Sequence, residues 1–395
     1  MRKRMKTNPF TPAAMAPLPT LVLSAFVLTV LLLSASPRSV LAEETTTAEG
    51  YASAADGSSC YYVNGQPYTG PRTISGSQYY FINGIMQTQY WYTDESGNQY
   101  YFSTDGTMAV GMTEINGSTY YFKANGTMVT GMKKISGDYY YFRENGKMKT
   151  GWLTTDNGNR YYFDKKTGIR VTGKKTIGNY IRYFNKKGVL YRSVNKKKKM
   201  VALTYDDGPI ANTATILNTL KKYNSVATFF VVGNRVSTYS STVKKAYNMG
   251  CEIGNHTYNH TILTTVSASF IKKQISSTNA AVKAVTGVRP VVMRPPGGGY
   301  NSTVQSAVKM PLINWSIDTR DWETHSASST ISAVLNHVQD GDIILMHDLY
   351  SWTSTASKTI IPTLVKRGYQ LVTVSELAEC RGGMKKGKVY TSFRK

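Results

Sequence analysis

A tyrosine-rich repeat of 20 or 21 residues is the feature that most constrains the fold of this chain. Its aromatic triplet recurs at Tyr79–Phe81, Tyr100–Phe102, Tyr120–Phe122, Tyr140–Phe142, Tyr161–Phe163 and Arg182–Phe184. A turn pair such as Asp105-Gly106 or Asn125-Gly126 follows each triplet. Aromatic strands interrupted by tight Asn-Gly turns are typical of short β-hairpins. One such hairpin cannot bury a core alone, so residues 60–190 are predicted to form an all-β solenoid of stacked hairpins.

The second half of the chain has a different pattern, in which apolar runs alternate with helical segments. The predicted strands are Val201–Leu203, Ala227–Val232, Val291–Met293, Ile313–Ile317, Ile343–Met346 and Leu371–Val374. The predicted helices are Thr213–Tyr223, Ser269–Val285, Thr330–Val338 and Lys358–Arg367. This alternation predicts an α/β fold with a parallel β/α barrel, in which chemistry is placed at the carboxyl ends of the strands.

Residues 1–42 have the organisation of an export signal. A basic start at Arg2–Arg4 precedes an apolar segment, Leu21–Ala35, and Val40–Ala42 supplies small residues for cleavage before Glu43. An uncleaved membrane anchor is the alternative, although a full span takes about 20 residues. Both readings place the remaining chain outside the cell, and they therefore exclude nucleic acid as a partner.

The net charge of +24 is unevenly distributed. Residues 191–395 hold 26 basic and 11 acidic residues, including a basic linker at 191–200 and a basic tail at 381–395. Such a surface favours an anionic polymer as its neighbour. The three cysteines, Cys60, Cys251 and Cys380, are too few for a disulfide scaffold. Isolated thiols are expected, and a Cys251–Cys380 bridge stays open.

Two adjacent carboxylates, Asp206 and Asp207, follow the first predicted strand of the second half and precede Gly208-Pro209. Like charges this close oppose each other's ionisation, and a cation relieves that cost. His256 and His260 have the i, i+4 spacing that brings side chains to one face of a helical turn. With Asp207 they would form a catalytic metal site with open positions. Zn²⁺ is the first expectation, and Co²⁺, Ni²⁺, Mn²⁺ or Fe²⁺ suit the same ligands.

Three further motifs follow in order: Arg294 before Pro295–Gly297, Asp318 to Trp322, and Leu345 to His347. Together with the paired carboxylates and the histidines, they resemble the NodB-type polysaccharide deacetylases, carbohydrate esterase family 4. The resemblance covers 201–380 and implies a distorted (β/α)7 barrel. It also implies a metal-dependent hydrolase that removes acetyl groups from N-acetylated sugars.

The resemblance assigns roles to individual residues of this chain. Asp206 would be the general base and His347 the general acid. Arg294 would hydrogen-bond Asp206 through a bidentate contact and maintain its charge. Asp321 would pair with His347, with Arg294 as a further partner, and tune its pKa.

Substrate contacts are also implied. The Gly297 amide would help bind the oxyanion, although family members carry an aromatic residue nearby and this chain has one only at Tyr300. Trp322 would wall the sugar pocket and Leu345 would line the acetyl-methyl pocket. Both residues fit a plain core equally well. Asp318 and Asp348 have no assigned role.

The hairpin region resembles the cell-wall-binding, choline- and glucan-binding repeats of Gram-positive surface proteins. The choline version has a Gly-Trp pair in each repeat, and here Gly111-Met112 and Gly131-Met132 replace it, with Gly151-Trp152 retained. A wall polymer or glucan is therefore favoured over choline. The candidate ligand residues are Tyr101, Tyr121, Tyr141 and Trp152, and the alternative is that these rings serve only as the core of the solenoid.

The combined reading is a secreted, Gram-positive, cell-wall-associated deacetylase that acts on peptidoglycan N-acetylglucosamine. Chitin oligomers, poly-N-acetylglucosamine or acetylxylan are alternative substrates, the last for an O-acetylesterase. A wall-binding adhesin with an inactive barrel is the rival from another class, and the complete motif set counts against it. The sequence leaves the oligomeric state open.

Overall fold

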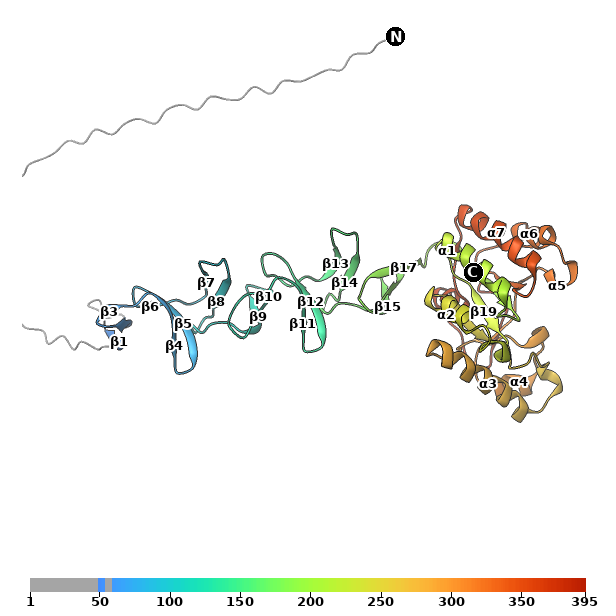
Figure 1. Cartoon of the computed structure of the whole chain (residues 1–395), viewed down its shortest axis with the longest axis horizontal. Helices are drawn as coiled ribbons and strands as arrows, with labels where there is room; N and C mark the ends of the chain where they lie inside the picture. The colour runs from blue at the N-terminus through green and yellow to red at the C-terminus, as the bar shows by residue number, and fades with distance from the viewer. Residues whose placement is uncertain (1–48, 54–58) are drawn as a thin grey trace, which may run out of the picture. The chain divides into compact units, whose positions relative to one another are not determined.

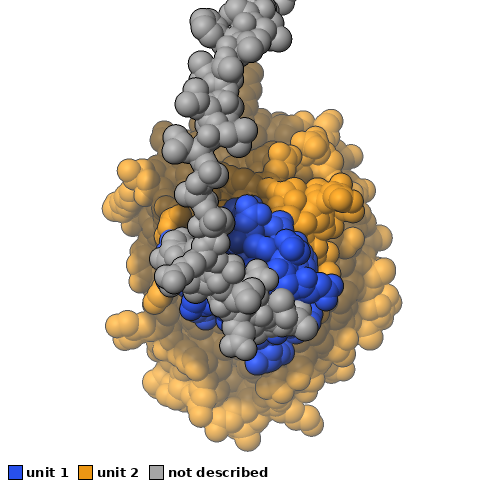
Figure 2. All heavy atoms as spheres, turned by 90° about the vertical axis from the view of Figure 1, so that its left-hand side faces the viewer, with its two compact units in different colours: residues 1–90, 102–108 blue, residues 91–101, 109–395 orange. Residues whose placement is uncertain are grey.

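A computed structural model of the chain describes residues 49–53 and 59–395. The expected signal segment, 1–42, lies outside the described residues. Figure 2 distinguishes two compact units. The described residues of the first unit are 49–53, 59–90 and 102–108, and those of the second unit are 91–101 and 109–395. No helix within the described ranges is both long and apolar enough to cross a bilayer.

Short antiparallel strands form the repeat region (Figure 1). The early strands are β1 (Glu49–Ser53), β2 (Ser59–Val63), β3 (Gln66–Pro67), β4 (Gly70–Ile74), β5 (Ser77–Ile82), β6 (Ile85–Met86), β7 (Tyr90–Thr93) and β8 (Gln99–Phe102). The later hairpins are β9 (Gly111–Ile115) with β10 (Ser118–Phe122), β11 (Gly131–Ile135) with β12 (Asp138–Phe142), and β13 (Gly151–Thr154) with β14 (Arg160–Phe163). A three-stranded sheet, β15 (Gly173–Ile177), β16 (Tyr180–Phe184) and β17 (Leu190–Asn195), ends the series.

The tight hairpin turns precede the aromatic triplets rather than follow them. Asn116-Gly117 joins β9 to β10 with φ of 48° and 68°, and Ser136-Gly137 joins β11 to β12 with φ of 49° and 97°. Two consecutive residues at positive φ match the twist of a two-residue hairpin. The Asn-Gly pairs after the triplets form a second turn, which a single bridge such as Phe142 to Met148 closes.

The third residue of each triplet supplies the core of the repeats. Six phenylalanines at this position are at most 2% exposed: Phe81, Phe102, Phe122, Phe142, Phe163 and Phe184. Burying such a ring contributes about 1.5–3 kcal/mol. The period of the repeat is therefore the period of its buried phenylalanines.

Replacing one of these rings should destabilise the repeats strongly. Phe142→Ala is expected to lower the free energy of unfolding by about 3–5 kcal/mol, because it removes a fully buried ring and leaves a cavity. Urea unfolding of the chain measures this change. Met132→Ala, at a side chain that is 39% exposed in the neighbouring strand, is the control. Similar losses for both variants would contradict the role of Phe142 as core.

Five parallel strands organise the second half, in the order β20-β19-β18-β23-β22. They are β18 (Met200–Asp206), β19 (Thr228–Val231), β20 (Glu252–Asn255), β22 (Ile317–Asp318) and β23 (Ile343–His347). β24 (Gln370–Leu371) pairs with the start of β18, and β21 (Leu312–Ile313) pairs with β25 (Val389–Tyr390). Single parallel bridges through Met293 continue the sheet from Asn255 to Leu312. The expected closure of this sheet into a barrel stays a prediction.

The helices lie between the strands, as the sequence pattern predicts (Figure 1). They are α1 (Ala211–Lys222), α2 (Ser240–Asn248), α3 (Ala268–Thr286), α4 (Ser302–Val308), α5 (Asp321–Thr324), α6 (Ala327–Leu335), α7 (Ser351–Lys366) and α8 (Val374–Cys380). Short 3₁₀ turns are η1 (Gly233–Arg235), η2 (Leu263–Thr265) and η3 (Pro296–Gly298).

Side chains alternate along β18 between two buried clusters. Val201, Leu203 and Tyr205 pack with apolar residues of α1 and α7, whereas Met200 and Ala202 belong to the other cluster. Because successive strand residues point to opposite faces, Thr204 and Asp206 share the face of Ala202. This alternation places the first carboxylate on the face of the sheet that carries Met200 and Ala202.

Several predicted boundaries differ from the observed ones. Ile313–Ile317 is two short strands rather than one, because Arg294 donates to the carbonyls of Ile313 and Asn314. β17 occupies half of the expected linker 191–200, so only Lys196–Lys199 connect it to β18. The expected tail, 381–395, contains β25 and the buried Phe393.

Candidate active site

The paired carboxylates lie where β18 ends. Asp206 is the last residue of the strand and stands in register with His347 of β23. Asp207 has φ of 73°, a left-handed conformation that turns the chain away from the strand. The two carboxylates therefore diverge: Asp206 continues the face of the sheet that carries Ala202, and Asp207 points toward the loop that follows β20.

The three predicted metal ligands are brought together. Nε2 of His256 lies 3.3 Å and Nε2 of His260 lies 3.1 Å from Oδ1 of Asp207. One ligand atom from each residue falls within 4.8 Å of the others. The prediction of a helical turn for the two histidines is wrong: they lie in a loop after β20, where Thr257 and His260 both have φ of 64°. The loop replaces the helix because the buried Asn255 accepts a hydrogen bond from the Thr257 amide at 2.8 Å.

The chemistry of these donors fits a divalent cation. Nδ1 of His256 lies 2.7 Å from the Arg294 carbonyl, which can only accept, so this nitrogen carries the proton. The lone pair of Nε2 then faces Asp207 Oδ1, which is buried and has no hydrogen-bond partner among the described residues. One carboxylate and two imidazoles leave positions open for water and substrate.

Asp206 is held by Arg294, as predicted, through one nitrogen rather than two. Nη1 of Arg294 donates to Asp206 Oδ1 at 2.8 Å and to Thr204 Oγ1 at 2.7 Å. Its other nitrogens donate to backbone carbonyls, so the bidentate geometry is not formed. Burial lowers the pKa of Arg294, and the Asp206 charge opposes that effect. This buried ion pair fixes Oδ1 of Asp206. The other carboxylate oxygen, Oδ2, lies 3.8 Å from Nε2 of His256.

His347 is bonded to Asp321, the partner that the resemblance implies. Its Nδ1 lies 2.7 Å from Asp321 Oδ1, and its backbone amide donates to Oδ2 at 2.8 Å. Burial disfavours the charged ring, but the hydrogen bond that its Nδ1 donates to Asp321 and the charges of nearby carboxylates raise the pKa of His347 to about 9. The ring is therefore protonated at neutral pH, with Nε2 as its remaining donor. Among the described residues, no hydrogen bond or ion pair joins Asp321 to Arg294.

The expected substrate residues have mixed positions. Trp322 and Tyr300 are 48% and 47% exposed, as residues that meet a polymer would be. Gly297 lies in η3 with φ of 65° and is exposed. Leu345 is buried in β23, in register with Thr204 and Asp318.

Sequence reasoning missed several residues that support the site. Thr353 donates to Asp321 Oδ2 at 2.6 Å, and the Trp352 indole donates to the Asp321 carbonyl at 2.8 Å. The Trp352 ring stacks on Tyr350, whose centroid lies 6.1 Å from that of His347. Both aromatic residues follow the third motif within five residues of His347, and this proximity is the signal that could have identified them.

Asp348 also has a structural role that the sequence did not reveal. It is fully buried under Gly208, accepts a hydrogen bond from Thr213, and has a pKa raised by burial to about 7. A Cβ at Gly208 would lie 2.2 Å from its Oδ2, so glycine is required there. Asp348 thereby links α1 to the turn that carries Asp206 and Asp207.

Removing the Thr213 hydroxyl should weaken this link. Thr213→Val is expected to cost about 1–3 kcal/mol of unfolding free energy, because it leaves the buried Asp348 without its donor. Chemical denaturation measures the loss. Thr215→Val, at a half-buried position on the same helix, is the control. An unchanged stability for Thr213→Val would contradict the structural role of this pair.

The repeat residues predicted to bind ligand differ in exposure. Tyr101 is 8% exposed and packs against Trp91 at 5.0 Å, so it belongs to the core. Tyr121 and Tyr141 are half-buried beside Phe142 and Phe163. Tyr141 and Trp152 line one hollow of about 490 Å³.

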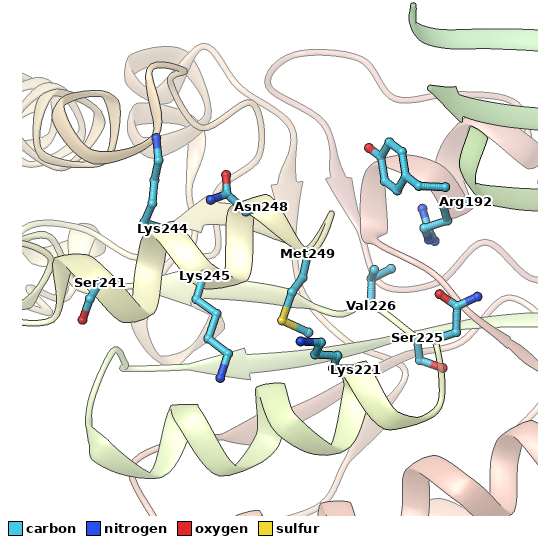
Figure 3. A pocket seen from close by; sticks show the side chains of 11 residues that line it. Arg192, Lys221, Ser225, Val226, Ser241, Lys244, Lys245, Asn248 and Met249 are labelled. Atoms are coloured by element: carbon cyan, nitrogen blue, oxygen red, sulfur yellow. The ribbon is translucent and has the colours of Figure 1, made fainter. Parts of the chain in front are cut away.

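A larger hollow, of about 720 Å³, lies away from the catalytic residues (Figure 3). Side chains of β17, α1, α2 and the loop after α1 line it, including Tyr191, Lys221, Lys244 and Lys245. None of the predicted catalytic or metal-binding residues contributes to its lining. It is therefore not the candidate active site.

Comparisons with known proteins agree with this geometry. The family model described as polysaccharide deacetylase matches residues 193–312. A peptidoglycan-N-acetylglucosamine deacetylase of Bacillus cereus is 35% identical over 199 residues, which cover 48% of this chain and 93% of the relative. This chain belongs to the polysaccharide deacetylase family.

Two more relatives are similar in sequence to about half of this chain. A peptidoglycan-N-acetylmuramic acid deacetylase of Bacillus subtilis is 42% identical over 190 residues, 48% of this chain and 41% of the relative. A bifunctional xylanase/deacetylase of Pseudobutyrivibrio xylanivorans is 42% identical over 191 residues, 47% of this chain and 32% of the relative. The chain thus spans less than half the length of these two relatives.

The repeats match family models of their own. Residues 129–170 match a choline-binding repeat, and residues 91–108 and 114–128 match a cell wall binding repeat. These matches confirm the predicted class of hairpin repeat in this family member.

Proposed function

We propose that this chain is a secreted, metal-dependent N-deacetylase of peptidoglycan N-acetylglucosamine, held at a Gram-positive wall by its hairpin repeats. The observation that supports this most is the cluster of Asp207, His256 and His260 near the Asp206–Arg294 pair, with His347, the partner of Asp321, on the neighbouring strand. The relatives named for peptidoglycan deacetylation support the choice of polymer. We also infer that the parallel sheet closes into a distorted (β/α)7 barrel.

The residues divide the work of amide hydrolysis. Zn²⁺ is the proposed metal, with Co²⁺, Ni²⁺, Mn²⁺ or Fe²⁺ as alternatives; when bound, it would acidify water and polarise the acetyl carbonyl. Asp206 takes the proton of the attacking water, and Arg294 keeps its carboxylate charge compensated. His347, protonated and oriented by Asp321, gives a proton to the leaving amine nitrogen. The Gly297 amide, Leu345, Trp322 and Tyr300 would contact the acetyl group and sugar.

A second substrate class has its own support. A relative from Cellvibrio japonicus is named as a bifunctional xylanase/xylan deacetylase and favours acetylxylan, on which the same residues would hydrolyse an ester. The choice between amide and ester is made by the sugar pocket and not by the metal ligands. Both polymers therefore belong in the same assay.

The test is acetate release by the purified full chain from peptidoglycan, chitin oligomers and acetylxylan. We expect release from peptidoglycan that a chelator abolishes and added Zn²⁺ or Co²⁺ restores. His256→Gln should abolish release, whereas His337→Gln, at an exposed histidine outside the site, should leave it unchanged. Absence of release from every acetylated glycan with metal loaded would overturn the enzyme and favour the adhesin.

A further inference from the structure

The charge of the repeat region changes sign along the chain. Residues 59–128 contain 2 basic and 4 acidic side chains, whereas residues 129–195 contain 15 basic and 4 acidic ones. The basic part includes the segment that matches the choline-binding repeat. Similarity to this family predicts a site for choline, which is a quaternary ammonium cation. The predicted site therefore lies in the basic part of the repeats, where a cationic ligand is repelled.

The hollow of about 490 Å³ in this basic part joins aromatic and cationic side chains. Tyr141 and Trp152 supply the rings, and Arg143 and Lys149 supply two positive charges. Glu144 is the acidic residue in the lining. Burial, followed by the charge of Arg143, lowers the pKa of Lys149, as expected for like charges placed close together.

Guanidinium groups of the chain itself already cover the aromatic surface. The Arg160 guanidinium lies 4.7 Å and that of Arg182 lies 5.3 Å from the centre of the Trp152 ring. Arg170 lies 4.1 Å from the centre of Tyr139 in the same way. An aromatic face attracts one cation, so a quaternary ammonium at Trp152 would have to displace an arginine or approach two like charges.

The cations around this hollow are not neutralised by carboxylates of the described residues. Throughout the described residues, no carboxylate forms an ion pair with Arg143, Lys149, Arg160 or Arg182. Arg182 donates to the Ser193 hydroxyl through Nη1, and its Nε is buried without a partner. A guanidinium stacked on a ring retains its in-plane N–H groups, and these match the oxygens of a phosphate or carboxylate.

We propose that residues 129–195 bind an anionic wall polymer, made of hydroxylated units that carry phosphodiester or carboxylate groups, and do not bind choline. The rings of Tyr141 and Trp152 contact the hydroxylated units. Arg143 and Lys149 in the hollow, with Arg160 and Arg182 over the Trp152 ring, bind the anionic groups. This inference deepens the proposed function, because it names the wall component that holds the enzyme. Binding is measured without deacetylation, so its failure is distinguishable from failure of the enzyme.

The test is calorimetric titration of the full chain with poly(glycerol phosphate), polygalacturonate and choline chloride at low and high salt. We expect a salt-sensitive complex with at least one of the anionic polymers and none with choline. The tighter polymer identifies phosphodiester or carboxylate as the source of the anionic groups. Binding of choline, or of neither anionic polymer, would overturn the proposal.

Paired variants locate the site. Arg143→Gln with Lys149→Gln should weaken polymer binding at least tenfold, and Arg160→Gln with Arg182→Gln should weaken it and let choline bind the uncovered ring. Lys221→Gln with Lys244→Gln, in the basic hollow of Figure 3, removes the same charge and should change binding less than twofold. Equal losses for the first and third pairs would overturn the site. If the arginine pair unfolds the repeat, the Arg143–Lys149 pair alone decides.

Discussion

Asp206→Asn should lower kcat for acetate release by a factor of about 10²–10⁴, the contribution typical of a positioned general base. The substitution keeps the shape of the side chain and its contact with Arg294, and removes the charge that accepts the proton of water. KM should change far less than kcat, because the substrate does not need this charge in order to bind. Steady-state assays on peptidoglycan measure both constants.

Asp207→Asn is the matched comparison, one residue away. It should lower metal affinity, because its Oδ1 lies 3.1–3.3 Å from both imidazoles, whereas Asp206→Asn should retain the metal. Metal content after dialysis separates the two variants. Equal metal loss in both, or full activity in Asp206→Asn, would contradict the division of roles between the carboxylates.

The sequence predicted the site well because its motifs lie at strand ends. Once β18, β23 and the segment at Met293 are aligned in parallel, Asp206, His347 and Arg294 must converge at one edge. This convergence follows from strand direction alone. The structure also brings Asp207 close to His256 and His260, and Asp321 close to His347, whereas the roles assigned to these residues stay predictions.

The loops and the buried polar network could not be predicted. The strand β20 was not predicted, because its residues, Glu252–Asn255, include only one strongly apolar side chain. Pairing with β19 fixes this strand instead. The His256–His260 loop depends on Asn255, which bonds α3 through the Ile275 carbonyl. Asp348 and Thr213 are 135 residues apart, and no local pattern joins them.

The repeats show the same limit. Their period revealed the hairpins, because the buried phenylalanines recur with it. The ligand surface depends instead on residues that differ between copies. Arg160 and Arg182 cover one tryptophan from different strands, a contact set by stacking of neighbouring hairpins. Family-level repeat patterns therefore predict the scaffold better than the ligand.

Asp321→Asn should shift the alkaline limb of the kcat/KM profile to lower pH and reduce kcat at least tenfold at pH 8. Asp321 is the main group that raises the pKa of His347 to about 9 against the effect of burial. Without that carboxylate the ring loses its proton at lower pH, and the acid form needed by the leaving amine is depleted. The pH dependence of acetate release measures this shift.

Stability gives a second readout of the same contact. Since folding raises the pKa of His347 above the ordinary 6.5, its protonated form stabilises the fold below pH 6.5, and this contribution is lost as pH rises through about 9. The difference in unfolding free energy between the native chain and Asp321→Asn should therefore shrink between pH 6 and pH 10. Asp318→Asn, at an exposed carboxylate of the same motif, should move neither the rate profile nor the stability. An alkaline limb that stays in place in Asp321→Asn would show that another group supplies the proton to the leaving amine.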